Sequence, residues 1–377
     1  MEVVAFSCKG RGLCPSCTTR RSVETAAQLE AWLPRVGYRQ WTLSLPGSLR
    51  WVVLRTKGLL GAVERALVRA VFRWQRGCVR TLGLTGSVEG GAVSFLQLFG
   101  SALQMTPHFH VLVPEGGWTK EGRFVPLPPP DTHEVEAVLQ RALRHLRRRL
   151  ADVEGLCLED DDARLLEGSQ PVLVDVPGRA PARRARLAVA HGFSLHADTA
   201  VQANDRQGLE TLCRYGARGA LALARLRRLD DGHYEYRTKR GGSLLLTASA
   251  LLKRLLLLVP PRGLHLTRFH GVFAPNATLR AAVALPSADT VPALPGLCAP
   301  LSAGPRPSRR PRLDWAALQL RTFGDDVFRC PCGGRRKVVA IVTHRRTAEV
   351  VLTNLGLLRP RPHLPPAQAP PQLSLGL

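Results

Sequence analysis

The stretch FLQLFGSALQMTPHFHVLVPEGGW, residues 95–118, carries most of the information about the fold. From Pro107 to Val113 polar and apolar residues alternate, which is typical of a β-strand with one face on the core. His108 and His110 therefore point to the same face of that strand, with roughly 6.5 Å of backbone between them. Two imidazoles at this spacing can bind one cation. An isolated His-x-His match is more often structural. Whether this pair binds a metal therefore has to be judged from the neighbouring residues.

The residues just before the histidines, Ala92–Phe99, form a second apolar run that predicts a strand. If the two strands pair as a hairpin, Gln97 is a polar side chain inside an apolar environment. A buried amide needs hydrogen-bonding partners, and a metal ion accepts its carbonyl oxygen. Gln97 is therefore the candidate third metal ligand. The alternative is an amide on the sheet face that bonds to backbone.

The charge of the chain points to a polyanionic partner. The net charge is +24, and all but six of the 53 basic residues are arginine. Guanidinium groups suit bidentate phosphate contacts, and binding to nucleic acid releases counterions. The alternative is that an Arg-, Ala- and Gly-rich composition reflects only a GC-rich genome. The start of the sequence lacks a signal peptide pattern and no apolar run is long enough to span a membrane. We therefore expect a cytoplasmic, nucleoid-associated protein with no membrane partner.

The order of patterns along the 377 residues predicts several segments. A central α+β domain is expected to contain extended segments at WTLSLP (41–46), LRWVVL (49–54) and VAHGFSLHAD (189–198). Helices are expected over 59–82, 133–152 and 205–229 and near residue 250, and a hairpin over 233–248. The predicted domains are a partial Cys-rich module (1–40), the central domain (41–283), a Pro/Ala-rich linker (284–313), a small Cys-containing unit (314–355) and a disordered tail (356–377).

Tyr215 is one of four tyrosines and lies in the segment predicted to be helical over 205–229. The apolar residues of that segment recur at helical spacing and would face the core. Tyr215 is off that stripe, on the side of Arg214 and Arg218. A tyrosine between two guanidinium groups could meet a phosphate, so both arginines are candidate DNA-binding residues. The alternative is an ordinary amphipathic tyrosine at the surface.

Five of the nine cysteines lie in two clusters near the ends of the chain. Cys8, Cys14 and Cys17 have the spacing C-x5-C-x2-C, with glycines between them. A zinc knuckle needs four ligands, and this cluster supplies three. Cys330 and Cys332 form a C-x-C pair where a zinc ribbon has C-x-x-C. The first cluster therefore predicts a partial Zn²⁺ site, and the second is a weaker candidate.

Several blocks in order resemble the rolling-circle transposases of insertion sequences and common-region elements, which carry a His-hydrophobic-His (HUH) signature. The histidine stretch is one block. The others are FSCKGRGLCPSC (6–17), RQWTLSLPGSLRW (39–51), GLETLCRYGARGALA (208–222), HLTRFHGVFAPNATLR (265–280) and FRCPCGG (328–334). Residues 115–190 and the tail carry no resemblance. Coincidence does not explain so many blocks in the family's order.

The resemblance implies an HUH endonuclease-like fold that nicks and rejoins single-stranded DNA at the ends of a mobile element. Tyr215 would be the nucleophile of a single-tyrosine enzyme and would form a 5′-phosphotyrosine. His108, His110 and Gln97 would hold Mg²⁺ or Mn²⁺. His196 and His270 are possible active-site neighbours or ordinary core histidines.

The family's zinc module carries another Cys pair upstream, so this chain is expected to begin partway through it. Because the first Cys pair of the module is missing from this sequence, a second hypothesis stays open: the chain is a catalytically inactive DNA-binding remnant of such a transposase. A metallohydrolase of small substrates that uses the histidine pair is a third, and the +24 charge argues against it. The oligomeric state and the DNA sequence recognised do not follow from these patterns.

Overall fold

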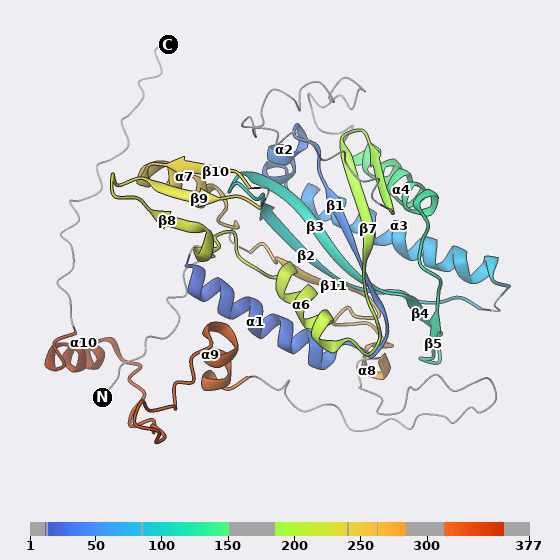
Figure 1. Cartoon of the computed structure of the whole chain (residues 1–377). Helices are drawn as coiled ribbons and strands as arrows, with labels where there is room; N and C mark the ends of the chain where they lie inside the picture. The colour runs from blue at the N-terminus through green and yellow to red at the C-terminus, as the bar shows by residue number, and fades with distance from the viewer. Residues whose placement is uncertain are drawn as a thin grey trace, which may run out of the picture. The chain divides into compact units, whose positions relative to one another are not determined.

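The largest part of the fold is a six-stranded sheet with the strand order β11-β2-β3-β1-β7-β6 (Figure 1). All neighbouring strands in it run antiparallel. This confirms the prediction of an α+β chain with an antiparallel sheet. The strands are β1 (Tyr38–Ser44), β2 (Gly91–Phe99), β3 (Met105–Pro114), β6 (Leu187–Ala190), β7 (Phe193–Val201) and β11 (Thr267–Gly271).

The computed structural model describes residues 12, 14–83, 86–150, 185–239, 241–261, 263–283 and 313–357. Within the chain, Met1–Asp325 and Asp326–Leu377 are two separate units. Cys8 lies outside the described residues, as do nearly all of the predicted linker (284–313) and of the predicted tail (356–377).

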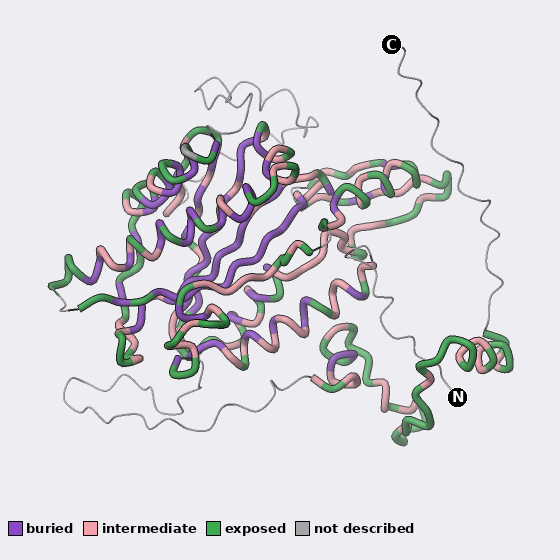
Figure 2. Tube along the Cα trace, turned by 180° about the vertical axis from the view of Figure 1, so that it is seen from behind, coloured by how far each residue is buried: buried purple, intermediate pink, exposed green. Residues whose placement is uncertain are grey.

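Helices cover both faces of the sheet (Figures 1 and 2). Phe95 and Leu112 point to the face covered by two helices, α1 and α6, which we call the α1/α6 face. Phe109 and Val111 point to the opposite face, covered by α2, α3 and α4, which we call the α3/α4 face. Burial of each such side chain contributes about 1.5–3 kcal/mol. The helices are α1 (Pro15–Trp32), α2 (Leu49–Arg55), α3 (Leu59–Thr81), α4 (Thr132–Leu150) and α6 (Arg206–Gly216).

A buried acidic residue, Glu64 on α3, connects that helix to the sheet. Its carboxylate contacts Ser94 on β2 and both Arg268 and His270 on β11. Burial alone would raise the pKa of Glu64, but hydrogen bonds from His270 and Ser94 and the charge of Arg268 outweigh it and lower the pKa. The network therefore ties the edge strand β11 to α3. His270 belongs to this network on the α3/α4 face.

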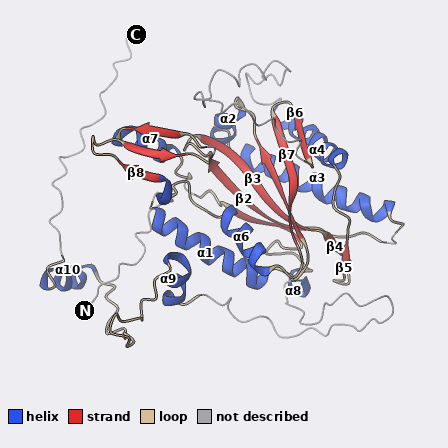
Figure 3. Ribbon diagram, in the orientation of Figure 1, coloured by secondary structure: helices blue, strands red, loops and turns tan. Residues whose placement is uncertain are grey.

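A second, three-stranded sheet with the order β10-β9-β8 lies beside the end of β2 (Figure 3). Its Tyr236 and Leu246, together with Leu251 of α7, pack on Phe99 and Leu103. This confirms the hairpin predicted over 233–248 and the helix near residue 250. The elements are η1 (Leu223–Arg225), β8 (Leu226–Arg228), β9 (Tyr234–Arg237), β10 (Ser243–Leu246) and α7 (Ala248–Leu257). The unit Met1–Asp325 also contains β4 (Gly116–Trp118), β5 (Phe124–Pro126), α8 (Arg280–Val283) and α9 (Trp315–Phe323).

The segment LRWVVL (49–54), predicted to be extended, is the helix α2 instead. Its buried residues are Leu49 and Val53, four positions apart, which is helical spacing. The helix starts directly after a turn in which Leu49 N–H donates to Pro46 O. A short apolar run cannot be assigned to strand or helix by periodicity alone.

Two further boundaries differ from the prediction. The helix expected over 205–229 ends at Gly216, and the following residues turn to the second sheet, where Ala220 and Leu221 join its core. The extended segment expected over 189–198 is a hairpin of β6 and β7. His191 and Gly192 form its two-residue turn with φ of 48° and 71°, the positive values that a type I′ turn requires.

The unit Asp326–Leu377 contains one helix among its described residues, α10 (Arg345–Asn354). Before it, a tight turn holds the sulfur atoms of Cys330 and Cys332 2.9 Å apart. In the part of the chain that the structure describes, no helix combines the length and the apolar character needed to cross a bilayer.

Candidate active site

The two histidines of β3 lie side by side on the α1/α6 face, as their alternation predicts. His108 is opposite Gln97 of β2, and His110 is opposite Phe95. The centroids of the two imidazole rings are 4.9 Å apart, and the rings meet edge to face. His110 is buried and His108 is partly buried. The sheet therefore holds the pair on rigid backbone.

The hydrogen bonds of the histidines leave one nitrogen of each ring available. His108 Nδ1 lies 2.8 Å from the carbonyl oxygen of Thr106. Since a carbonyl only accepts, Nδ1 carries the proton, and Nε2 of the neutral ring keeps its lone pair. His110 Nδ1 contacts Thr42 Oγ1 at 3.2 Å, and its buried Nε2 has no partner. A metal-binding histidine typically donates its other ring N–H in this way.

Gln97 bonds to backbone through its amide nitrogen, as in the alternative given for it, and leaves its amide oxygen without a partner. Its Nε2 donates to the carbonyl oxygens of Tyr215 and Gly216, at 2.7 and 3.0 Å. Its Oε1 is buried and has no partner. A buried oxygen without a donor is costly, and a cation would satisfy it. The amide thus holds the end of α6 and leaves its oxygen free for a cation.

These three side chains fit a divalent cation through two imidazole nitrogens and one amide oxygen. Among the described residues, no group of three or more His, Cys, Asp and Glu side chains has an arrangement that could hold a metal ion. The buried amide oxygen of Gln97 is the candidate third donor beside the two imidazole nitrogens. Nitrogen and carbonyl-oxygen donors accommodate Mn²⁺ and, less readily, Mg²⁺.

Both histidines are in the neutral form that binds metal. Burial lowers the pKa of His110 to about 3, and the neighbouring His108 and nearby cations act in the same direction. Burial also lowers the pKa of His108, more than its bond to Thr106 raises it. The charges of Arg218, Lys239 and Arg50 lower it further.

Tyr215 lies against His110, one member of the histidine pair. It occupies the last turn of α6, and its ring meets that of His110 edge to face, with centroids 5.4 Å apart. Gly216 makes this approach possible, because a Cβ at that position would lie 2.6 Å from the Phe95 ring. The tyrosine is 36% exposed, so it lies at the surface of the fold.

Two cations flank the tyrosine. The Arg218 guanidinium lies over its ring, 4.5 Å from the centroid. Lys239 Nζ donates to Tyr215 Oη at 2.9 Å. Burial by itself would raise the pKa of Tyr215, but the Lys239 hydrogen bond and the charge of Arg218 outweigh burial and lower it. The surroundings therefore favour the phenolate, which is the nucleophilic form.

Sequence reasoning missed two of the cations at this site. Lys239 is in the turn between β9 and β10. Arg50 is the second residue of α2, and its buried Nε has no partner. Neither stands in a pattern that singles it out among 53 basic residues. Of the two predicted DNA-binding residues, the structure brings Arg218 to the tyrosine, whereas Arg214 is exposed near the end of α6.

The other candidates of the sequence lie away from the pair. His196 is opposite Thr42 on β7, one strand further from His110. Cys14 immediately precedes α1, and Cys17 is buried in the first turn of that helix.

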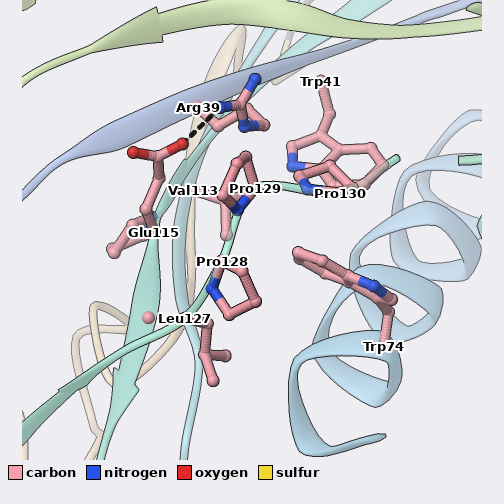
Figure 4. Close-up of a pocket in the computed structure, with 11 residues that line it drawn as sticks. Arg39, Trp41, Trp74, Val113, Glu115, Leu127, Pro128, Pro129 and Pro130 are labelled. Carbon is pink, nitrogen blue, oxygen red and sulfur yellow. Dashed lines mark hydrogen bonds and ion pairs between the residues drawn. The ribbon is translucent and has the colours of Figure 1, made fainter. Parts of the chain in front are cut away.

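A small pocket lies on the opposite face of the sheet (Figure 4). An ion pair of Arg39 with Glu115 forms one wall. Trp74 of α3 and the proline run 128–130 form the others. Its cation is already neutralised, and the sheet separates it from the histidines. We therefore assign it no part in the active site.

Two transposase family models match parts of this chain. Residues 91–280, half of the chain, match the family model described as "Putative transposase". Residues 1–45 match the model described as "Transposase zinc-binding domain". The first range contains the histidine pair, Gln97, Tyr215 and Lys239.

One curated relative is "Putative transposase y4qJ" of Sinorhizobium fredii (strain NBRC 101917 / NGR234). It is 26% identical over 284 residues, which is 71% of this chain and 66% of that protein. No solved structure matches the chain.

Proposed function

Because the chain belongs to the transposase family whose model matches residues 91–280, we propose that it nicks and rejoins single-stranded DNA at the ends of a mobile element. The nucleophile is Tyr215. One observation carries the proposal: the Tyr215 hydroxyl accepts a hydrogen bond from Lys239, and its ring lies against His110. A phenol of lowered pKa, a pair of histidines and two cations thus meet at one place on the antiparallel sheet.

The side chains that would hold the divalent cation, Mg²⁺ or Mn²⁺, are His108, His110 and Gln97. The support is that Nε2 of His110 and Oε1 of Gln97 are buried without partners. A bound cation polarises the phosphate and stabilises the charge that develops on its oxygens. Gln97 also bonds to the backbone of Tyr215, so the same amide positions the nucleophile relative to the cation.

The reaction is a transfer of a phosphodiester to tyrosine. The phenol proton is lost to solvent, and the Lys239 ammonium stabilises the resulting phenolate. Tyr215 Oη attacks phosphorus, the P–O3′ bond breaks, and the released 3′-oxygen takes a proton from water. The tyrosine keeps the 5′-phosphate. Because bond energy is conserved in this ester, attack by another 3′-OH reseals the strand without ATP.

The N-terminal module has a separate role in this proposal. The match of residues 1–45 to a zinc-binding transposase domain indicates Zn²⁺. We assign Cys8, Cys14 and Cys17 as ligands, which leaves the fourth position to another group. The module 1–40 would recognise the element end, and the domain 41–283 would cut it.

The test is covalent capture. Wild type is incubated with Mg²⁺ or Mn²⁺ and single-stranded oligonucleotides that tile both ends of the element encoding this chain. A denaturation-resistant protein–DNA adduct is expected. Tyr215→Phe abolishes it, and Tyr234→Phe, a matched change in the second sheet, does not. An equal adduct from Tyr215→Phe rejects the nucleophile. Absence of any wild-type adduct supports a DNA-binding remnant.

A further inference from the structure

The helix α3 carries a continuous stripe of arginines on its outer side. They stand three or four residues apart, which places them on one side of a helix. The core-facing residues of α3 lie on the opposite side. From first to last the stripe covers about 22 Å, at 1.5 Å per residue. Its members are Arg65, Arg69, Arg73, Arg76 and Arg80, all exposed except the half-buried Arg76.

The neighbouring helix α4 widens this stripe. Arg141 lies close enough to Arg73 for their charges to interact, and Glu134 is similarly close to Cys78. The two helices therefore run antiparallel, and the second half of α4 lies beside the first half of α3. That half of α4 carries Arg141, Arg144 and Arg147 at three-residue spacing, on the side away from its buried residues. We call these three and the exposed residues Arg65, Arg69 and Arg73 the arginine surface.

Among the residues that the structure describes, acidic side chains do not neutralise the arginine surface. Glu64 of α3 is buried and engaged by Ser94 and β11. The acids of α4, Glu134 and Glu136, lie in its first turns, at the other end of the helix pair. In the described part of the chain, no ion pair or hydrogen bond involves a side chain of the arginine surface. Uncompensated charge of this kind attracts a polyanion.

The shape and composition of the surface favour paired over single-stranded DNA. Proteins that hold single strands stack bases on aromatic side chains. The aromatics of α3, Phe72 and Trp74, pack partly buried against the core. Two parallel rows of guanidinium groups on the outer sides of packed helices instead match phosphates, which carry no sequence information.

We propose that the arginine surface binds the phosphate backbone of duplex DNA independently of sequence. Tyr215 and the histidine pair are on the α1/α6 face, whereas the arginine surface is on the α3/α4 face. One molecule therefore holds a single strand for cleavage on one side of the sheet and duplex on the other. This inference does not depend on the tyrosine chemistry, and either can fail alone.

The experiment measures fluorescence anisotropy of the full-length protein with a 24-base-pair duplex of arbitrary sequence over a salt series. The variant is Arg65→Gln/Arg69→Gln/Arg73→Gln. Loss of three phosphate contacts reduces the slope of log K against log salt by about 2.7, and the affinity at 0.1 M salt by roughly 500-fold. Adduct formation with a short single strand keeps its rate.

The control variant, Arg329→Gln/Arg335→Gln/Arg346→Gln, makes the same change of net charge at exposed positions in the other unit. For this control, the slope of log K for duplex binding against log salt is expected to stay within one unit of the wild-type slope. An unchanged slope in the α3 variant, or an equal loss in the control, overturns the proposal. So does binding of the arginine surface to anionic lipid vesicles with no change in duplex affinity. Circular dichroism melts of both variants establish that they fold.

Discussion

Lys239→Met removes the ammonium that bonds to the tyrosine hydroxyl and keeps most of the apolar stem. The bond is 2.9 Å long and has a charged donor. Such bonds contribute about 1.5–3 kcal/mol. Lys239 is exposed, so water screens its charge, and we take the lower end. A loss of about 1.5 kcal/mol in the stabilisation of the phenolate slows adduct formation roughly tenfold.

The effect has a pH signature. Lys239 lowers the pKa of Tyr215, so the variant's phenol titrates at higher pH than that of wild type. Below both pKa values the variant has the smaller fraction of phenolate, and its rate is lower. As the pH rises past the lowered pKa of the wild-type phenol, the wild-type rate levels off and the two rates approach each other. The measurement is single-turnover adduct formation from pH 6 to 10 at saturating metal and DNA.

Lys253→Met is the matched control, since Lys253 is an exposed lysine of α7. It is expected to keep the wild-type rate at all pH values. A loss in Lys239→Met that is the same at every pH refutes the proposed effect on the phenolate. It would indicate that Lys239 only positions the second sheet or binds DNA.

Three further predictions concern the metal site, the fold and the substrate. His108→Ala or His110→Ala abolishes nicking and leaves the affinity for single-stranded DNA within a few-fold, because phosphate contacts dominate affinity; equal losses of both would indicate a structural role. Glu64→Gln lowers the free energy of unfolding in urea by about 1–3 kcal/mol at pH 7, because buried donors lose a charged acceptor. Folding lowers the pKa of Glu64. The stability that its carboxylate contributes is therefore complete at pH values above the ordinary carboxyl pKa and disappears as the pH falls through the lowered pKa. A difference in unfolding free energy between wild type and Glu64→Gln that persists in acid contradicts this. A single strand with the element's end is cut and the same sequence fully paired is not, since pairing obstructs Tyr215; efficient nicking of relaxed duplex would reject the proposed site.

The sequence predicted those parts of the fold that depend on local patterns. The strands of the His108 hairpin and the helix over 59–82 follow from alternation and from helical spacing, which nearby residues determine. Errors arose where tertiary contacts decide the outcome. The segment 49–54 has too few residues for its period to show, and the end of α6 depends on Gln97, whose side chain binds the last carbonyls from a distant strand.

In the candidate site, too, some residues could be predicted from local sequence patterns and others depend on tertiary contacts. His108, His110 and Gln97 share a hairpin, so their common face could be inferred from register. The contact of Lys239 with Tyr215 spans 24 residues and depends on how the second sheet packs at the end of β2. No periodicity in the sequence carries that information. The aromatic contact of Tyr215 with His110 likewise requires Gly216 to pack on Phe95.

The charge balance of the site suggests how metal and DNA bind together. Its candidate ligands are neutral, and the charges of Arg50, Arg218 and Lys239 act on the histidine pair. A dication at this place would be repelled by three cations, and no carboxylate of the described residues acts on the histidine pair. A phosphate bound to those cations reverses the local sign of charge, so each ligand is expected to favour the other.

The last prediction is therefore that DNA raises the affinity for metal. Mn²⁺ binding is measured by electron paramagnetic resonance on Tyr215→Phe, which cannot cleave, with and without a single strand from the element's end. A coupling of about 1–3 kcal/mol corresponds to a 5- to 150-fold lower Kd for Mn²⁺ in the presence of DNA. Linkage requires that Mn²⁺ lower the Kd for DNA by the same factor. Gln97→Ala should weaken Mn²⁺ binding in both states. Equal Mn²⁺ affinity with and without DNA would show that the three cations do not control access of the metal, and the charge argument would be wrong.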